Sequence, residues 1–168
     1  MSHKYLFYLL DYLEFGKFLI NSVKRIYGQS FAYICVNRIL SKSKIIIKRG
    51  IKQGCALSMF LYTTGIEELL VRISKNEKII GYSVPSTIPR IIKSTGYADD
   101  IGGLLRTLES LGFFFEEFKN WGKLSGASVN EDKTKIVAIN SAYTEYNSVK
   151  FVDKVKILGI TFNKVGVS

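Results

Sequence analysis

Two adjacent aspartates, Asp99 and Asp100, are the residues of this sequence best suited to metal chemistry. They lie between two runs rich in apolar and β-branched residues, 91–97 and 101–105, a pattern typical of a β-hairpin with carboxylates at its tip. Mg²⁺ takes oxygen ligands, usually one or two carboxylates together with substrate phosphates. The sequence therefore predicts a metal-binding hairpin over 91–105. The alternative is an ordinary turn, because Asp and Gly both favour turns.

Positive charge is concentrated in the first half of the chain. The 168 residues carry a net charge of +10; residues 1–84 hold 13 basic and 5 acidic side chains, and residues 85–168 hold 11 and 9. One strip contains only basic charges: Arg38, Lys42, Lys44, Lys48, Arg49 and Lys52. A strip of this density is typical of a surface that binds a polyanion such as nucleic acid. A solvated lysine-rich face has the same composition, so charge alone leaves both interpretations open.

Length and composition restrict the class of protein. The chain is 47% hydrophobic and 23% charged and has only 2 Pro, which favours one globular domain over a disordered chain. Its cysteines, Cys35 and Cys55, form no Cys-x-x-Cys pair, so we expect neither a disulfide framework nor a zinc site, and a reducing intracellular compartment. No apolar run reaches the ~18 residues that span a membrane. We therefore expect no membrane contact and no signal peptide.

The spacing of apolar residues predicts an α+β protein. Helical spacing occurs in two segments between residues 3 and 27, which are broken at Gly16, and over 57–75 and 107–123. Strand-like patterns cover 30–48, 91–105, 127–129, 136–139, 149–152 and 155–162, and residues 76–90 are expected to be a connection. We expect an antiparallel sheet centred on the 91–105 hairpin and packed on the helices 57–75 and 107–123.

A histidine, a run of phenylalanines and a glycine-containing loop could each have a structural role or bind a ligand. The only histidine, His3, is expected to be an exposed residue at a helix start rather than a ligand or a base. The run Phe113–Phe115 could stack on bases, but its helical spacing favours core packing. Glycines flank Gln53 in the loop 49–58, which leads into a helix. Glycine allows close approach of the backbone to a ligand, and a helix start favours anions.

Four stretches, in one order along the chain, resemble the motifs of reverse transcriptases. They are the template- and nucleotide-contacting loop (Arg49 to Ser58), the metal-binding hairpin (Tyr97-Ala98-Asp99-Asp100), the next palm motif (Ser125-Gly126 with Asn130, Lys133 and Thr134) and the primer-grip region (Ile157-Leu158-Gly159). Cysteine after Gly54, and the closing Leu-Gly, are similar to the non-LTR (LINE-type) retrotransposon branch rather than to group II intron proteins. The resemblance implies a right-hand polymerase fold with a palm-like antiparallel sheet. Residues 1–168 would form a partial domain, the palm with part of the fingers.

The sequence departs from the family pattern at two places. Ala56 and Met59 stand where the family usually or often has proline. The family also carries a first palm motif, with another metal-binding aspartate, shortly before a Ser-His-x-Tyr-Leu stretch. Here that stretch is Ser2 to Leu6, so we expect the chain to begin just after the motif and to lack the thumb and the N-terminal fingers. Asp11, on the polar side of the first helix, is not expected to replace that aspartate.

The resemblance implies RNA-directed DNA polymerisation, in which a primer 3′-hydroxyl attacks the α-phosphate of a deoxynucleoside triphosphate. Two Mg²⁺ ions, about 3.5–4 Å apart, stabilise the attacking and leaving oxygens. Asp99 would be the principal ligand and Asp100 a secondary one, since adjacent strand residues diverge, and Lys133 would assist the leaving pyrophosphate. The implied nucleotide and template contacts are Arg49, Gly50, Gln53, Gly54 and Tyr97. The basic strip would follow the phosphate backbone of the RNA template and DNA primer.

Three outcomes stay open at the level of the sequence. The chain is part of a polymerase, in which case residues 1–168 alone are expected to give no metal-dependent primer extension. Alternatively, it is a catalytically inactive remnant that binds nucleic acid, or a fragment that does not fold stably because a cut sheet exposes edges. The family implies a ribonucleoprotein in the nucleus or cytoplasm, and the oligomeric state is left undetermined.

Overall fold

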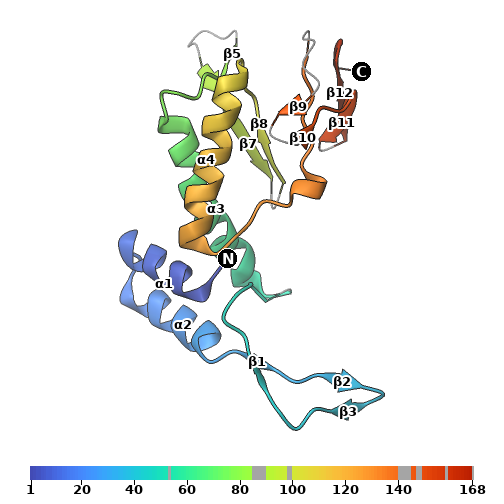
Figure 1. Ribbon diagram of the computed structural model, residues 1–168. Helices are drawn as coiled ribbons and strands as arrows, with labels where there is room; N and C mark the ends of the chain where they lie inside the picture. The colour runs from blue at the N-terminus through green and yellow to red at the C-terminus, as the bar shows by residue number, and fades with distance from the viewer. Residues whose placement is uncertain are drawn as a thin grey trace. The chain divides into compact units, whose positions relative to one another are not determined.

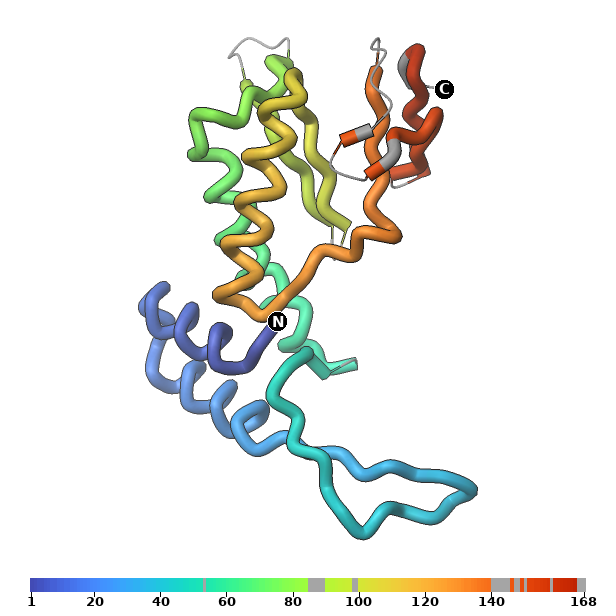
Figure 2. Tube along the Cα trace, in the orientation of Figure 1, coloured from blue at the N-terminus to red at the C-terminus, as the bar shows by residue number. Residues whose placement is uncertain are grey.

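The computed structural model describes residues 1–52, 54–84, 90–97, 100–139, 145–146, 149–157 and 159–167. The chain divides into two compact units, Met1–Ser128 and Val129–Ser168, and each is described by itself. Figure 1 and Figure 2 show helices together with short antiparallel strands along the chain, which confirms the predicted α+β class.

The described residues of the first unit include four α-helices, which correspond to the predicted helices. They are α1 (His3–Tyr12), α2 (Lys17–Gly28), α3 (Ala56–Lys75) and α4 (Leu108–Ser125). Side-chain oxygens cap two of them, because Ser2 accepts a hydrogen bond from the Tyr5 amide (3.2 Å) and Thr107 accepts one from the Ser110 amide (3.1 Å). Gly126 ends α4 in the left-handed conformation, with φ of 70°.

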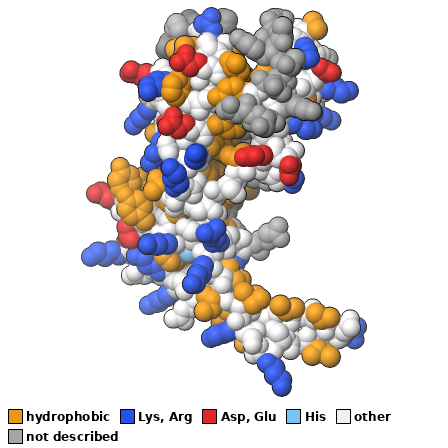
Figure 3. All heavy atoms as spheres, in the orientation of Figure 1, with side chains coloured by type: hydrophobic (Ala, Val, Ile, Leu, Met, Phe, Trp, Pro, Cys, Tyr) orange, Lys and Arg blue, Asp and Glu red, His pale blue; other side chains and the backbone are white. Residues whose placement is uncertain are grey.

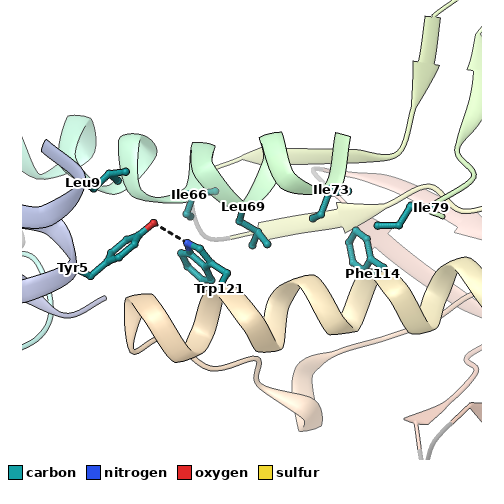
Figure 4. Close-up of a cluster of buried hydrophobic side chains, with 8 residues drawn as sticks. All are labelled: Tyr5, Leu9, Ile66, Leu69, Ile73, Ile79, Phe114 and Trp121. Carbon is teal, nitrogen blue, oxygen red and sulfur yellow. Dashed lines mark hydrogen bonds between the residues drawn. The ribbon is translucent and has the colours of Figure 1, made fainter. Parts of the chain in front are cut away.

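Two clusters of buried side chains hold these helices together. The first joins α1, α3 and α4 through Tyr5, Leu9, Ile66, Leu69, Ile73, Ile79, Phe114 and Trp121, as Figure 4 shows. The second joins α1, α2 and α3 through Leu6, Leu10, Ile20, Val23, Tyr27 and Leu61. The first cluster contains a polar centre: the Tyr5 hydroxyl donates to Glu68 Oε2 (2.6 Å) and accepts from Trp121 Nε1 (3.0 Å). Phe114 belongs to the core, as its helical spacing predicts.

The strands of the first unit pair as antiparallel hairpins. Between α2 and α3, β1 (Phe31–Ala32) pairs with β4 (Ile45–Ile46) and β2 (Cys35–Val36) pairs with β3 (Ile39–Leu40), so the predicted 30–48 hairpin is present. Between α3 and α4, β5 (Tyr82–Val84) pairs with β6 (Arg90–Ile92), and β7 (Ser94–Tyr97) pairs with β8 (Asp100–Gly103). The described strands form separate small ladders. A continuous palm-like sheet therefore stays a prediction.

The second unit differs from its sequence prediction. Residues 127–129, at the boundary of the two units, form no strand, and a 3₁₀ turn, η1 (Glu131–Lys133), follows in the second unit. The expected single strand over 155–162 is a hairpin of β11 (Lys154–Ile157) and β12 (Ile160–Asn163), and β12 also pairs with β13 (Gly166–Val167). Gly159, with φ of 89°, permits the turn. A further short hairpin pairs β9 (Glu145–Tyr146) with β10 (Val149–Lys150).

The connection predicted over 76–90 also contains structure. Its residues include β5 and the first residue of β6, which the sequence analysis missed. A strand of only three residues carries too little alternation to stand out from an irregular loop.

Replacing Tyr5 by Phe is expected to lower stability at neutral pH and to remove part of its loss at alkaline pH. The Trp121 N–H keeps the Gly65 carbonyl as a partner, so the change removes hydrogen bonds without leaving this donor unpaired, and each lost bond costs about 0.5–1.5 kcal/mol. Burial, assisted by the hydrogen bond to Glu68, raises the pKa of Tyr5. Because the folded-state pKa exceeds the unfolded value of 10.0, the stabilisation is present below pH 10 and is lost as the pH rises above it.

Urea unfolding of the parent and of Tyr5→Phe at pH 7 and pH 11 measures this effect. The stability difference should shrink at pH 11, whereas the exposed control Tyr12→Phe should differ little from the parent at either pH. A difference for Tyr5→Phe that is the same at both pH values would contradict the assignment.

Candidate active site

The acidic hairpin predicted around residue 99 is present in the first unit. Its register pairs Ser94 with Gly103 and Tyr97 with Asp100. Asp100 and Tyr97 are exposed and stand opposite one another beside the tip, while Ala98 and Asp99 at the tip lie outside the described residues. The structure thus brings together two of the residues that the sequence singled out, and the metal-binding role of both aspartates stays a prediction.

One face of this hairpin packs directly on the helices. An added Cβ at Gly96 would lie 3.2 Å from Leu70 of α3, and one at Gly103 would lie 2.9 Å from the Phe114 ring of α4. Since side chains alternate along a strand, Asp100 lies on the face opposite to Gly103. Two glycines and two core side chains therefore determine which face of the hairpin carries the carboxylate.

The base of the hairpin is fixed by a lysine that the sequence analysis missed. Lys93 Nζ donates to the backbone oxygens of Ser74 and Asn76, both at 2.8 Å, at the C-terminal end of α3. Its own carbonyl accepts the amide of Leu104 (2.9 Å). A cation suits the negative end of a helix, but no local pattern indicates that Lys93 reaches an end 17 residues earlier in the chain.

The basic strip lies on exposed residues of the 31–46 hairpin and of the loop that follows it. Arg38 occupies the hairpin turn with φ of 67°, and Lys44 Nζ lies 5.5 Å from the centre of the Phe31 ring. Figure 3 shows apolar and basic side chains along this hairpin. Within the described ranges, no ion pair involves Arg38, Lys42, Lys44, Lys48, Arg49 or Lys52. Their charges are therefore available to an external anion.

The predicted glycine-rich loop has the backbone that requires glycine. Gly50 and Gly54 have φ of 88° and 75°, in the left-handed region. Gln53 lies outside the described residues, so its predicted contact with a nucleotide is untested. Cys55 follows as the residue that precedes α3, and hydrogen bonding from the Leu57 backbone is the largest of the effects that lower the pKa of its thiol.

The expectation that His3 lies at a helix start is confirmed, because α1 begins there, but the expectation that it is exposed is wrong. Its side chain is only 6% exposed, and its Nε2 donates to the carbonyl oxygen of Gly50 at 2.8 Å. Ser2, not His3, caps α1, so the histidine lies in the first turn and packs edge-on against the Tyr27 ring. The stretch is polar in sequence, and a contact with a residue 47 positions away leaves no local signal. Asp11 pairs with Lys24 at 3.0 Å on the surface.

Lys133 lies in the second unit. It ends η1, is exposed, and its amide donates to Asn130 Oδ1 at 3.2 Å. Thr134 Oγ1 donates to the Asn130 carbonyl at 2.8 Å, so Asn130 organises this turn. The approach of Lys133 to the triphosphate of a bound nucleotide stays a prediction.

The donor chemistry of the hairpin fits a hard divalent cation in part. Asp100 offers exposed carboxylate oxygens, the ligand type that Mg²⁺ takes. Among the described residues, no group of three or more His, Cys, Asp and Glu side chains could hold a metal ion. The role of Asp100 as one ligand of a larger set stays a prediction. In the same ranges, no helix is long and apolar enough to cross a membrane.

Comparison with known proteins identifies the class to which this hairpin and loop belong. The family model described as "Reverse transcriptase (RNA-dependent DNA polymerase)" matches residues 7–162. The chain therefore belongs to the reverse transcriptase family, which confirms the resemblance found in the four motifs.

A transposon protein is among the relatives of the chain. It is the "Transposon TX1 uncharacterized 149 kDa protein" of Xenopus laevis, 26% identical over 153 residues, which are 91% of this chain and 11% of that protein. The chain thus spans about a tenth of the length of this curated relative. The relative is consistent with the retrotransposon origin that the motifs indicate.

Replacing Gly103 by Ala is expected to destabilise the first unit, because the new methyl group would overlap the Phe114 ring at 2.9 Å. Overpacking of this kind costs about 1–3 kcal/mol. The matched control is Gly28→Ala at the end of α2, where nothing lies within 4 Å of the added Cβ and φ is not positive. Denaturant unfolding of both variants should show a loss for Gly103→Ala alone, and equal stabilities would refute the packing.

Proposed function

We propose that the chain is a fragment of an RNA-directed DNA polymerase of a non-LTR retrotransposon, which extends a DNA primer on an RNA template with deoxynucleoside triphosphates. Residues 1–168 would be the palm with part of the fingers. The observation that carries the proposal is the hairpin beside Asp100, which packs on α3 and α4 through glycines in a chain of the reverse transcriptase family. A rigid base of this kind is what a metal-binding carboxylate needs.

The proposed roles of the acidic residues follow from charge. Mg²⁺ ions supply the positive charge that stabilises the attacking and leaving oxygens of phosphoryl transfer. Asp99 and Asp100 would hold this metal, Asp99 as the principal ligand and Asp100 as a secondary one. Lys133 would neutralise charge on the leaving pyrophosphate.

The loop residues, Tyr97 and the basic strip are proposed to bind and orient the nucleic acid and the nucleotide. Arg49, Gly50, Gln53, Gly54 and Tyr97 would surround the templating base and the incoming nucleotide. Arg38, Lys42, Lys44, Lys48 and Lys52 would contact phosphates, which fix the register of a duplex without reading its sequence. Such a protein would act inside the cell, in a ribonucleoprotein.

A second candidate function is a catalytically inactive protein that binds nucleic acid. The observation that favours it is the excess of 13 basic over 5 acidic side chains in residues 1–84, including six strip residues without an ion pair to any described acid. Such a protein keeps the phosphate contacts without needing the carboxylates.

A metal titration is expected to distinguish the two functions. Paramagnetic Mn²⁺, which shares the oxygen-ligand preference of Mg²⁺, should broaden the amide resonances of Tyr97, Asp100 and Ile101 in the parent chain. Asp99→Asn combined with Asp100→Asn should abolish the broadening, because no carboxylate is left at the tip. The control Asp153→Asn removes an exposed carboxylate of the second unit and should change nothing at the hairpin. Equal broadening in parent and double variant would favour the inactive protein.

Binding of an RNA–DNA hybrid is expected to depend on salt through the basic strip. Lys48→Ala and Lys52→Ala should each reduce the slope of log Kd against log salt by about 1, since each removes one phosphate contact. Lys164→Ala is the control, because Lys164 already pairs with Asp153 at 2.7 Å. Fluorescence anisotropy at several salt concentrations measures the slopes. If the parent binds no more tightly than an unrelated protein of equal charge, nucleic-acid binding by this strip is rejected.

A further inference from the structure

Gly50 is hydrogen-bonded at both of its backbone polar groups by the start of the chain. Its amide donates to the Met1 carbonyl at 2.9 Å, and its carbonyl accepts from His3 Nε2 at 2.8 Å. The histidine amide also donates to the Lys48 carbonyl (3.0 Å), and Ser2 and Arg49 form an isolated antiparallel bridge. Gly50, which needs a left-handed backbone, is therefore held by hydrogen bonds at both its amide and its carbonyl.

A second anchor holds the loop two residues further on. Ser58 Oγ donates to the Lys52 carbonyl at 2.6 Å and lies 3.0 Å from the Tyr27 hydroxyl. A serine hydroxyl has one hydrogen, so the tyrosine is the donor in the second contact. Lys52 Nζ also lies 6.0 Å from the centre of the Tyr27 ring.

The two anchors share one buried unit. The rings of His3 and Tyr27 pack edge to face with centroids 5.3 Å apart, and their side chains are 6% and 1% exposed. Neither residue carries a charge or a nucleophile toward the proposed substrates. Their polar atoms instead point to the main chain of Gly50 and, through Ser58, of Lys52.

We propose that His3 and Tyr27 are positioning residues that hold the backbone from Gly50 to Lys52 in the conformation that binds nucleic acid. A glycine-containing loop free of these bonds would populate many conformations, and ordering it on binding would weaken affinity. The inference rests on the proposed function only in naming nucleic acid as the ligand of the loop. The restraint itself is a property of the free chain.

Two variants each remove the polar group that makes the contact and keep an aromatic ring at the position. His3→Phe deletes the Nε2 donor, and Tyr27→Phe deletes the hydroxyl. Amide hydrogen exchange followed by NMR should speed up at Gly50 by about fivefold or more in His3→Phe, and at Ser58 in Tyr27→Phe, while the core amide of Leu69 keeps its rate. His3→Gln, which retains a side-chain N–H donor, should restore protection at Gly50.

Binding of the RNA–DNA hybrid provides the functional measurement. His3→Phe and Tyr27→Phe should weaken binding by about threefold to tenfold with an unchanged salt slope, because neither change removes a cation. Ile73→Ala, a core substitution in the other cluster of buried side chains, should lower stability and leave affinity unchanged under conditions in which the chain stays folded.

The outcomes separate the positioning role of His3 and Tyr27 from the proposed nucleic-acid binding. Unchanged exchange at Gly50 and Ser58 in both variants would overturn the positioning role, whatever the affinities are. Faster exchange with unaltered affinity would also overturn it, because the loop conformation would then be irrelevant to binding. Failure of the parent chain to bind the hybrid rejects the proposed function, and the exchange rates then decide the restraint alone. If His3→Phe fails to fold, Tyr27→Phe carries the test.

Discussion

The hydroxyl group of Tyr5 joins the three helices on which the rest of the first unit depends. It belongs to α1, donates to Glu68 of α3 and accepts from Trp121 of α4, and the indole N–H also reaches the Gly65 carbonyl at 3.2 Å. In a buried setting such a group is stabilising only when every polar atom is satisfied. No buried side-chain polar atom of the described residues lacks a hydrogen-bond partner. The Tyr5 hydroxyl thereby links α1, α3 and α4 within the buried cluster.

Two different supports grow from this helical base. The acidic hairpin is held by apolar packing, with Gly96 against Leu70 and Gly103 against Phe114, and Lys93 closes its base. The loop that carries Lys48, Arg49 and Lys52 is held by hydrogen bonds between its backbone and the first residues of the chain, and by one from the Ser58 hydroxyl. Asp100 and the basic strip are thus carried by separate elements of the first unit, and each element has its own kind of support.

Sequence reasoning predicted the helices well and the long-range contacts poorly, for a physical reason. Residues such as Leu69 and Ile73 recur at helical spacing on a buried face, so periodicity alone locates α3. The 94–103 hairpin was equally visible from its pattern. The His3 contact with Gly50 joins residues 47 positions apart, and the turn at Gly159 divides a run of uniform strand character. A long-range contact determines the first feature, and the positive φ angle of Gly159 determines the second. Local composition encodes neither.

The pairing of Tyr97 with Asp100 fixes the register of the acidic hairpin. Inserting one residue into a strand therefore has a different effect from inserting two. Successive strand side chains point to opposite faces, so a shift of one residue exchanges the faces of every side chain on that strand. Inserting a single residue between Asp100 and Gly103 would turn the carboxylate toward α4, or else drive a larger side chain into Phe114. Inserting two residues would restore the alternation. Substitutions at the outward positions leave this geometry intact, whereas a change of length by one residue does not.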